Sequence, residues 1–135
     1  MAQNIQSLWS PAIKATVLSP EAILKGQVEA LALQTGGLLL AQIVEEREDS
    51  QVSVSLDLLA PALHGSRHRI LKISHSEELL YPVKVEARSF PGSRWAHTDT
   101  EFTEVVAEVL NSDEVESVAQ SLLARANEAV THSVQ

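Results

Sequence analysis

The sequence predicts a single α+β domain, in which a four-stranded antiparallel meander carries one N-terminal and two C-terminal helices on one face. Three observations predict this fold class: apolar residues alternate along the middle of the chain, helix-start signals stand on both sides of that region, and the predicted strands follow one another through short turns. Strands joined by short turns pair antiparallel, and helices with a single apolar stripe cover one face of such a sheet. A length of 135 residues suits one domain.

The N-terminal part of the chain contains two Ser-Pro dipeptides, each a helix-start signal because serine can cap a helix and proline suits its first position. Ser10-Pro11 is followed by a short apolar pattern, so we expect residues 1–18 to form an arm or a short helix. Ser19-Pro20 opens a longer apolar pattern at helical spacing, which stops at Gly36-Gly37. This pattern predicts a helix over residues 20–35.

Residues 38–89 are predicted to form the sheet. The first strand runs from Leu38 into an acidic cluster at residues 45–49, which we expect to form a polar hairpin turn. The second strand alternates most clearly, with Val52, Val54, Leu56 and Leu58 on one face and Ser53, Ser55 and Asp57 on the other. Because the second set is polar, we expect its face of the sheet to meet water or a partner.

Two further strands complete the predicted meander. The third covers about residues 69–75 and follows a loop in which Pro61 ends the preceding ladder, because proline has no N–H to donate. The fourth follows from the alternation of apolar and charged residues over 83–88. Residues 90–93 contain proline and glycine next to serine, and this composition predicts a turn.

Residues 98–130 are predicted to form the two C-terminal helices. Thr98 and Glu101 have the spacing of a capping box, in which each side chain accepts a hydrogen bond from a backbone N–H at the start of the helix. Asn111-Ser112 interrupts the apolar stripe and restarts the helix. Acidic residues follow at the point where the helix dipole favours negative charge.

Composition and charge narrow the possible functions. The chain lacks cysteine, which removes disulfides, thiol nucleophiles and cysteine-based metal sites. Its net charge of −8 disfavours binding to nucleic acid or to anionic membranes, since both require basic surface. The sequence shows neither a secretory leader nor a membrane-length apolar run, so we expect a cytoplasmic protein with no membrane partner.

Residues 64–97 carry the main candidate site. This segment has a formal charge of +3 and four of the five histidines, whereas residues 98–135 have a charge of −7. Guanidinium groups can bind a carboxylate or phosphate, and aromatic rings beside positive charge can stack on a base. The favoured alternative is that these cations pair with the acidic C-terminal helices inside the fold. The candidate ligand-binding residues are His64, Arg67, His68, Arg69, His75, Tyr81, Arg94, Trp95 and His97.

Signals for metal binding and catalysis are weaker. His64 and His68 stand four residues apart, but Gly65 and the following strand pattern argue against the helix on which this spacing would bind zinc. His75 lies between two serines, yet neighbours along a strand point to opposite faces. We therefore expect His75 to be a partly buried, hydrogen-bonded histidine, and we predict no catalytic residue, no metal and no cofactor.

The leading functional hypothesis is a non-enzymatic protein that acts by binding another protein, most simply a second copy of itself. A small acidic domain with an open polar sheet face and apolar stripes on two successive helices favours a homodimer, formed through the sheet or through a C-terminal helix. The alternative is a small-ligand or phosphate-binding protein, or an enzyme, that uses the His and Arg residues at 64–69 and 94–97. Nucleic-acid binding is a third hypothesis.

Overall fold

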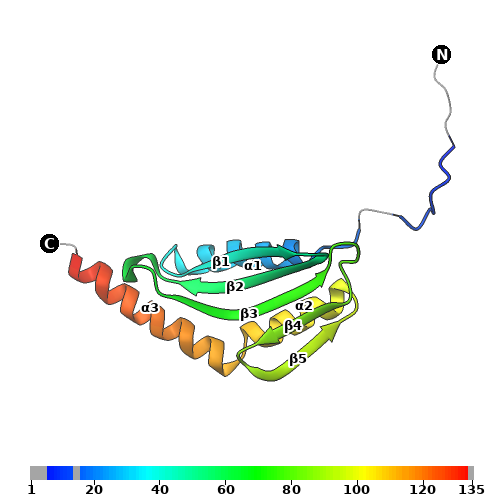
Figure 1. Cartoon of the computed structure of the whole chain (residues 1–135). Helices are drawn as coiled ribbons and strands as arrows, with labels where there is room; N and C mark the ends of the chain where they lie inside the picture. The colour runs from blue at the N-terminus through cyan, green and yellow to red at the C-terminus, as the bar shows by residue number, and fades with distance from the viewer. Residues whose placement is uncertain (1–5, 14–15, 134–135) are drawn as a thin grey trace, which may run out of the picture.

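The chain forms one antiparallel sheet and three α-helices, as a computed structural model that describes residues 6–13 and 16–133 shows (Figure 1). The strands are ordered β1-β2-β3-β4-β5, so each strand pairs with its neighbours in sequence, and β1 and β5 are the edges. The predicted α+β class and antiparallel pairing are confirmed. The elements are α1 (Pro20–Thr35), β1 (Leu40–Glu48), β2 (Gln51–Leu59), the 3₁₀ turn η1 (Pro61–Leu63), β3 (Arg67–Ser76), β4 (Val83–Ala87), β5 (Phe90–Ala96), α2 (Asp99–Leu110) and α3 (Asp113–Ser133).

The prediction of four strands was wrong, because residues 90–93 begin a fifth strand and are not a turn. The turn lies at Arg88 and Ser89. β5 is an edge strand, and one side of an edge strand makes no hydrogen bonds to another strand. Pro91, which has no N–H to donate, is therefore tolerated there. Gly92 adopts a φ of +70°, and the register with β4 shifts within this hairpin. Pro91, Gly92 and Ser93 are also typical turn residues, which is why the sequence predicted a turn at the start of this strand.

The β1–β2 hairpin is longer than predicted, because the acidic cluster lies mostly within a strand. β1 continues to Glu48, and the turn consists of Asp49 and Ser50 alone. Asp49 has a φ of +56°, a conformation that aspartate tolerates better than most residues. The side chains from Glu45 to Glu48 are exposed, so their charge opposes strand formation little.

Residues 6–13 and 16–18, which precede α1, contain no helix and belong to an arm that projects from the body of the molecule (Figure 1). The predicted short helix after Pro11 does not form in residues 10–13 and 16–18, while residues 14 and 15 lie outside the described residues. Two hydrogen bonds hold the base of the arm. The N–H of Leu18 donates to Asp99 Oδ2 at 3.1 Å, and its carbonyl accepts from the hydroxyl of Tyr81 at 2.8 Å.

The helices start at the residues that carry the predicted signals. Ser19 Oγ accepts from the N–H of Ala22 at 3.1 Å, and Thr98 Oγ1 accepts from the N–H of Glu101 at the same distance. The carboxylate of Glu101 accepts from the N–H of His97 at 2.7 Å, one residue before the position that a capping box uses. No helix in the described ranges is both long and apolar enough to span a membrane.

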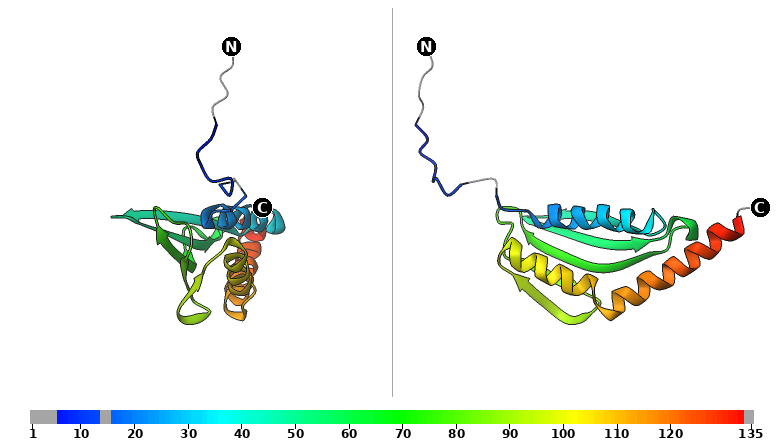
Figure 2. Two further views of the ribbon diagram at one scale, coloured as in Figure 1. Left: turned by 90° about the vertical axis from the view of Figure 1, so that its right-hand side faces the viewer. Right: turned by 180° about the vertical axis from the view of Figure 1, so that it is seen from behind.

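The three helices lie on one face of the sheet and leave the other face open (Figure 2). On the covered face, the alternating apolar residues of β2 are buried in one core with Leu24 of α1 and Phe102 of α2. The open face is polar, as predicted, yet Ser55 and Asp57 on it are also buried. β2 lies between β1 and β3, and neighbouring side chains flank these two short residues on both sides.

A β-bulge lies between β2 and β3. The register passes from Leu56 opposite Leu71 to Asp57 opposite Arg69, so Ile70 is the extra residue of β3. Ile70 is fully buried. The shift places Arg69 beside Asp57 on the open face, where Arg69 Nε and Asp57 Oδ1 lie 3.3 Å apart.

Candidate functional site

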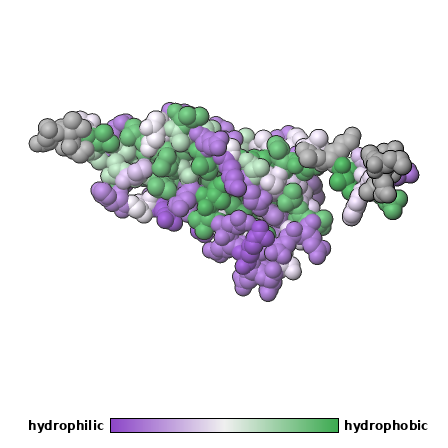
Figure 3. Space-filling model, turned by 90° about the horizontal axis from the view of Figure 1, so that it is seen from above, coloured by the Kyte–Doolittle hydropathy of each residue, from purple (hydrophilic) through white to green (hydrophobic). Residues whose placement is uncertain are grey.

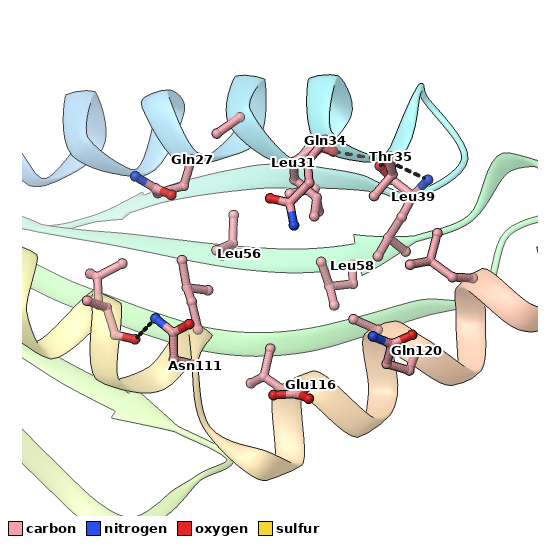
Figure 4. Close-up of a pocket in the computed structure, with 18 of the residues that line it drawn as sticks. Gln27, Leu31, Gln34, Thr35, Leu39, Leu56, Leu58, Asn111, Glu116 and Gln120 are labelled. Atoms are coloured by element: carbon pink, nitrogen blue, oxygen red, sulfur yellow. Dashed lines mark hydrogen bonds between the residues drawn. The ribbon is translucent and has the colours of Figure 1, made fainter.

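A groove of about 480 Å³ lies between α1 on one side and α2 and α3 on the other (Figure 4). α1 packs against β1, whereas α2 packs against β3 and β5. Between these helices, Leu56 and Leu58 of β2 form the floor of the groove together with Leu39 and Ala41, and Leu39, Leu56 and Leu58 are almost fully buried. We refer to this hollow as the α1–α3 groove.

The lining of the α1–α3 groove is apolar at its base and polar at its rim. Glu116 is the only charged residue among those that line it. The rim can donate and accept hydrogen bonds through side-chain amides, but the groove offers no cation, thiol or imidazole for chemistry. The apolar base is formed by Ile23, Leu31, Leu39, Leu56, Leu58, Val106, Val115 and Leu123, and the exposed amides at the rim are Gln27, Gln34, Asn111 and Gln120.

A second, smaller cavity of about 290 Å³ lies beside the first turn of α1 and is lined by charged residues of both signs. Its buried polar residue is His75, whose Nε2 lies 2.5 Å from Glu21 Oε1 and whose Nδ1 lies 2.7 Å from the carbonyl oxygen of Ser76. Both ring nitrogens therefore face oxygen acceptors, so a proton must lie on or between each pair of atoms. This contact joins β3 to α1, and the expectation of a buried, satisfied His75 is confirmed.

The predicted His and Arg cluster does not gather at one point. Arg67 and Arg69 lie on the open face of the sheet. His68, between them, points toward the helix side, where its buried Nε2 has no hydrogen-bond partner among the described residues. His64 is exposed in the loop after η1, with a φ of +51°.

The second half of the cluster is divided in the same way. Trp95 faces the open side of the sheet and is exposed, whereas its neighbour Arg94 faces α2, forms an ion pair with Glu108 and lies over the ring of Phe90 at 4.5 Å. His97 Nδ1 lies 3.4 Å from Glu101. Pairing of the central basic residues with the acidic C-terminal helices is thus present for Arg94, and His97 is in contact with Glu101. No three His, Asp or Glu side chains of the described residues are placed to hold a metal ion.

Tyr81 is placed at the base of the arm, away from the other candidate residues. Its ring packs edge-on against Phe102, with 6.5 Å between the ring centroids. Burial, reinforced by the nearby carboxylates of Asp99 and Glu21, raises the pKa of the Tyr81 hydroxyl to about 12. The neutral hydroxyl can then remain the donor to Leu18 over the whole physiological range of pH.

We expect absorbance titration of tyrosinate to show this shift directly, because Tyr81 is the chain's single tyrosine. The native protein should ionise with a midpoint near 12, and the protein unfolded in urea near the ordinary value of 10.0. Because the folded pKa is the higher one, this group's contribution to stability is complete below pH 10 and is lost as the pH rises toward 12. A native midpoint equal to that in urea would contradict the partial burial of the Tyr81 hydroxyl near Asp99 and Glu21.

Sequence reasoning missed the α1–α3 groove. Its lining residues follow the same helical and strand periodicity as the rest of the core, and several of them are buried, so no pattern marks them as the lining of a groove. The one available signal was in α1, where Ala30, Ala32 and Leu33 extend the apolar residues beyond a single stripe. Comparisons of the chain with protein-family models, with curated proteins and with solved structures found no match. The geometry alone therefore carries the functional argument.

Proposed function

We propose that this protein is a non-enzymatic binding protein that holds an apolar segment of a partner polypeptide in the α1–α3 groove. The observation that carries the proposal is the composition of the groove, with an apolar base, a rim of amides and one charge among all its lining residues. Its volume lies within the range of ligand sites, roughly 300–1,000 Å³. Burial of apolar side chains would supply the affinity.

The amide rim favours a polypeptide over a lipid or another purely apolar molecule. A bound segment brings backbone N–H and C=O groups that lose water and need partners. Glutamine and asparagine can offer both a donor and an acceptor, and Gln27, Gln34 and Gln120 stand along both walls of the groove (Figure 4). An apolar chain without backbone amides would leave these rim groups unpaired if it covered them.

Self-association remains the closest variant of this proposal. β1 is an edge strand, so its outer side has no neighbouring strand, and its first five residues, Leu40 to Val44, are only partly buried. The upper side of the molecule, which Figure 3 shows, carries apolar residues beside a hydrophilic projection, and Leu33 on α1 is 84% exposed. A second copy could meet this side, but no lining as enclosed as the α1–α3 groove is present there.

The phosphate-binding or enzymatic alternative has less support from the geometry. Arg69, His75, Arg94 and His97 each have an acidic partner, and the positive charges of Arg69 and Arg94 are thereby compensated. The candidate side chains also lie on both faces of the sheet and at the base of the arm. A phosphate site would need several of these groups to converge on one ligand.

The substitutions Ala30→Arg and Ala107→Arg are expected to weaken binding in the groove by about tenfold or more, because each places a long cation against its apolar base. Both alanines line the groove, from opposite walls, and are exposed, so the fold should tolerate the change. The measurement is fluorescence anisotropy of a labelled amphipathic peptide whose leucines follow helical spacing.

The matched control is Ala124→Arg, an exposed alanine on α3 that does not line the groove. It should bind the peptide like the unmodified chain, and melting curves of all three variants should agree within a few degrees. Equal binding by Ala30→Arg, Ala107→Arg and Ala124→Arg would contradict the proposal that the groove is the binding site.

A further inference from the structure

The arm before α1 carries several of the highly exposed large apolar side chains of the described chain. Leu8 is 96% exposed, Trp9 77%, Ile13 65% and Val17 61%. Apolar side chains in a continuous segment are costly to leave in water, and such segments usually mark a binding surface. The molecule therefore has an apolar segment exposed to water and, on its body, a groove with an apolar base.

The base of the arm lies at the end of the groove where α1 and α2 come together. Leu18 is hydrogen-bonded to Asp99, the first residue of α2, and it stands two residues before α1 begins. The nearest groove residues on the two helices are Ile23 and Thr103, each within about one turn of these starting points. The arm therefore leaves the body at one mouth of the groove.

The arm is long enough to cover the whole groove. The groove runs along α1 from Ile23 to Thr35, which is about 18 Å at 1.5 Å per helical residue. From Leu18 back to Leu8, an extended chain spans about 33 Å. Both Trp9 and Ile13 can therefore reach the apolar base without any change at the anchored Leu18.

The arm also matches the groove in charge. Within residues 6–18 the sequence contains one charged residue, Lys14, and it is positive. The groove has one charged lining residue, Glu116, and it is negative. The remainder of the arm is apolar, hydroxyl or amide, which suits the apolar base and the amide rim.

We propose that the arm folds back into the α1–α3 groove of its own chain, antiparallel to α1, and that a partner polypeptide must displace it to bind. This inference rests on the proposed function, because it makes the arm an internal competitor for the same site. Attachment to the chain gives the arm a high effective concentration at the groove. The extended arm in Figure 1 is then the open state, to which the partner binds.

The first test follows the arm itself through Trp9. The chain has two tryptophans, so Trp95→Phe, a change on the open sheet face, leaves Trp9 as the only one. We expect its emission to be blue-shifted and protected from acrylamide. Ala30→Arg or Ala107→Arg added to Trp95→Phe should shift the emission to the red and expose Trp9 to the quencher, whereas Ala124→Arg should do neither.

The second test measures competition in the full chain. The double variant Leu8→Ser, Trp9→Ser removes the apolar contacts of the arm without touching the body. We expect it to bind the labelled amphipathic peptide about tenfold more tightly. This gain corresponds to an unmodified chain in which the arm occupies the groove in about nine molecules of ten, so that only about one in ten is free to bind the peptide. Circular dichroism should show an unchanged fold, because both residues are exposed.

The outcomes separate this inference from the proposed function. A quencher-accessible Trp9 that Ala30→Arg does not change, together with unchanged affinity of the double variant, would overturn the inference even if the peptide binds the groove. Protection of Trp9 that disappears on dilution would also overturn it, because the arm would then occupy a second copy. Peptide binding that Ala30→Arg and Ala107→Arg leave intact would instead remove the proposed function, whatever Trp9 does.

Discussion

Replacement of Phe102 with alanine is expected to lower the free energy of unfolding by about 4 kcal/mol, within the range for a buried phenylalanine. Phe102 is fully buried and is the largest completely enclosed side chain in the described structure. It joins α2 to the sheet and packs edge-on against Tyr81, so its removal also loosens the base of the arm. Urea unfolding followed by circular dichroism measures the change.

The conservative control is Phe102→Leu, which keeps most of the buried volume and should cost less than about 1.5 kcal/mol. Leu33→Ala gives a second control, because Leu33 is exposed on the outer side of α1 and its truncation should cost less than about 0.5 kcal/mol. Comparable losses for Phe102→Ala and Leu33→Ala would contradict the position of Phe102 in the core.

Replacement of His75 with alanine is expected to lower the free energy of unfolding by about 3 kcal/mol at neutral pH. His75 is almost completely buried, and its substitution leaves the partly buried carboxylate of Glu21 and the carbonyl of Ser76 without partners. It also removes the contact that ties the start of α1 to the end of β3. Urea unfolding at constant pH measures the change.

The comparison for this prediction is His97→Ala, in which an exposed histidine 3.4 Å from Glu101 is removed. An exposed pair contributes little, so its loss should cost less than about 1 kcal/mol. Glu21→Gln provides a partial rescue of the His75 site, since a glutamine can still hydrogen-bond the ring. If His75→Ala and His97→Ala destabilise the protein equally, the buried contact is not a stabilising one.

Much of the fold follows from local sequence patterns. The alternation of β2, the Ser19 and Thr98 caps and the glycines after α1 each specify an element through nearest-neighbour chemistry, and the structure contains all of them. β5 could not be recognised in this way. Pro91 and Gly92 are unfavourable in a central strand but acceptable at an edge, and a residue's place at an edge depends on the whole sheet.

The candidate site was harder to predict than the fold. The sequence shows that cations gather between residues 64 and 97, and alternation already indicates that neighbours on a strand separate. The buried His75 followed from that alternation. The α1–α3 groove did not, because it depends on how α1, α2 and α3 pack relative to one another on the sheet. Spacing between packed helices depends on many side chains at once and leaves no periodic signal.

The bulge at Ile70 decides how charge is shared between the two sides of the sheet. In a regular ladder, Ile70 would stand opposite Asp57, and the side chains of both Arg69 and Arg67 would point toward the helices. The hydrophobic core cluster on that side contains no acidic residue to pair with them. The extra residue Ile70 reverses which residues of β3 point to each face, so both guanidinium groups lie on the open face. The charge on the open face therefore depends on this one extra residue in β3 as well as on the residue types in the strand.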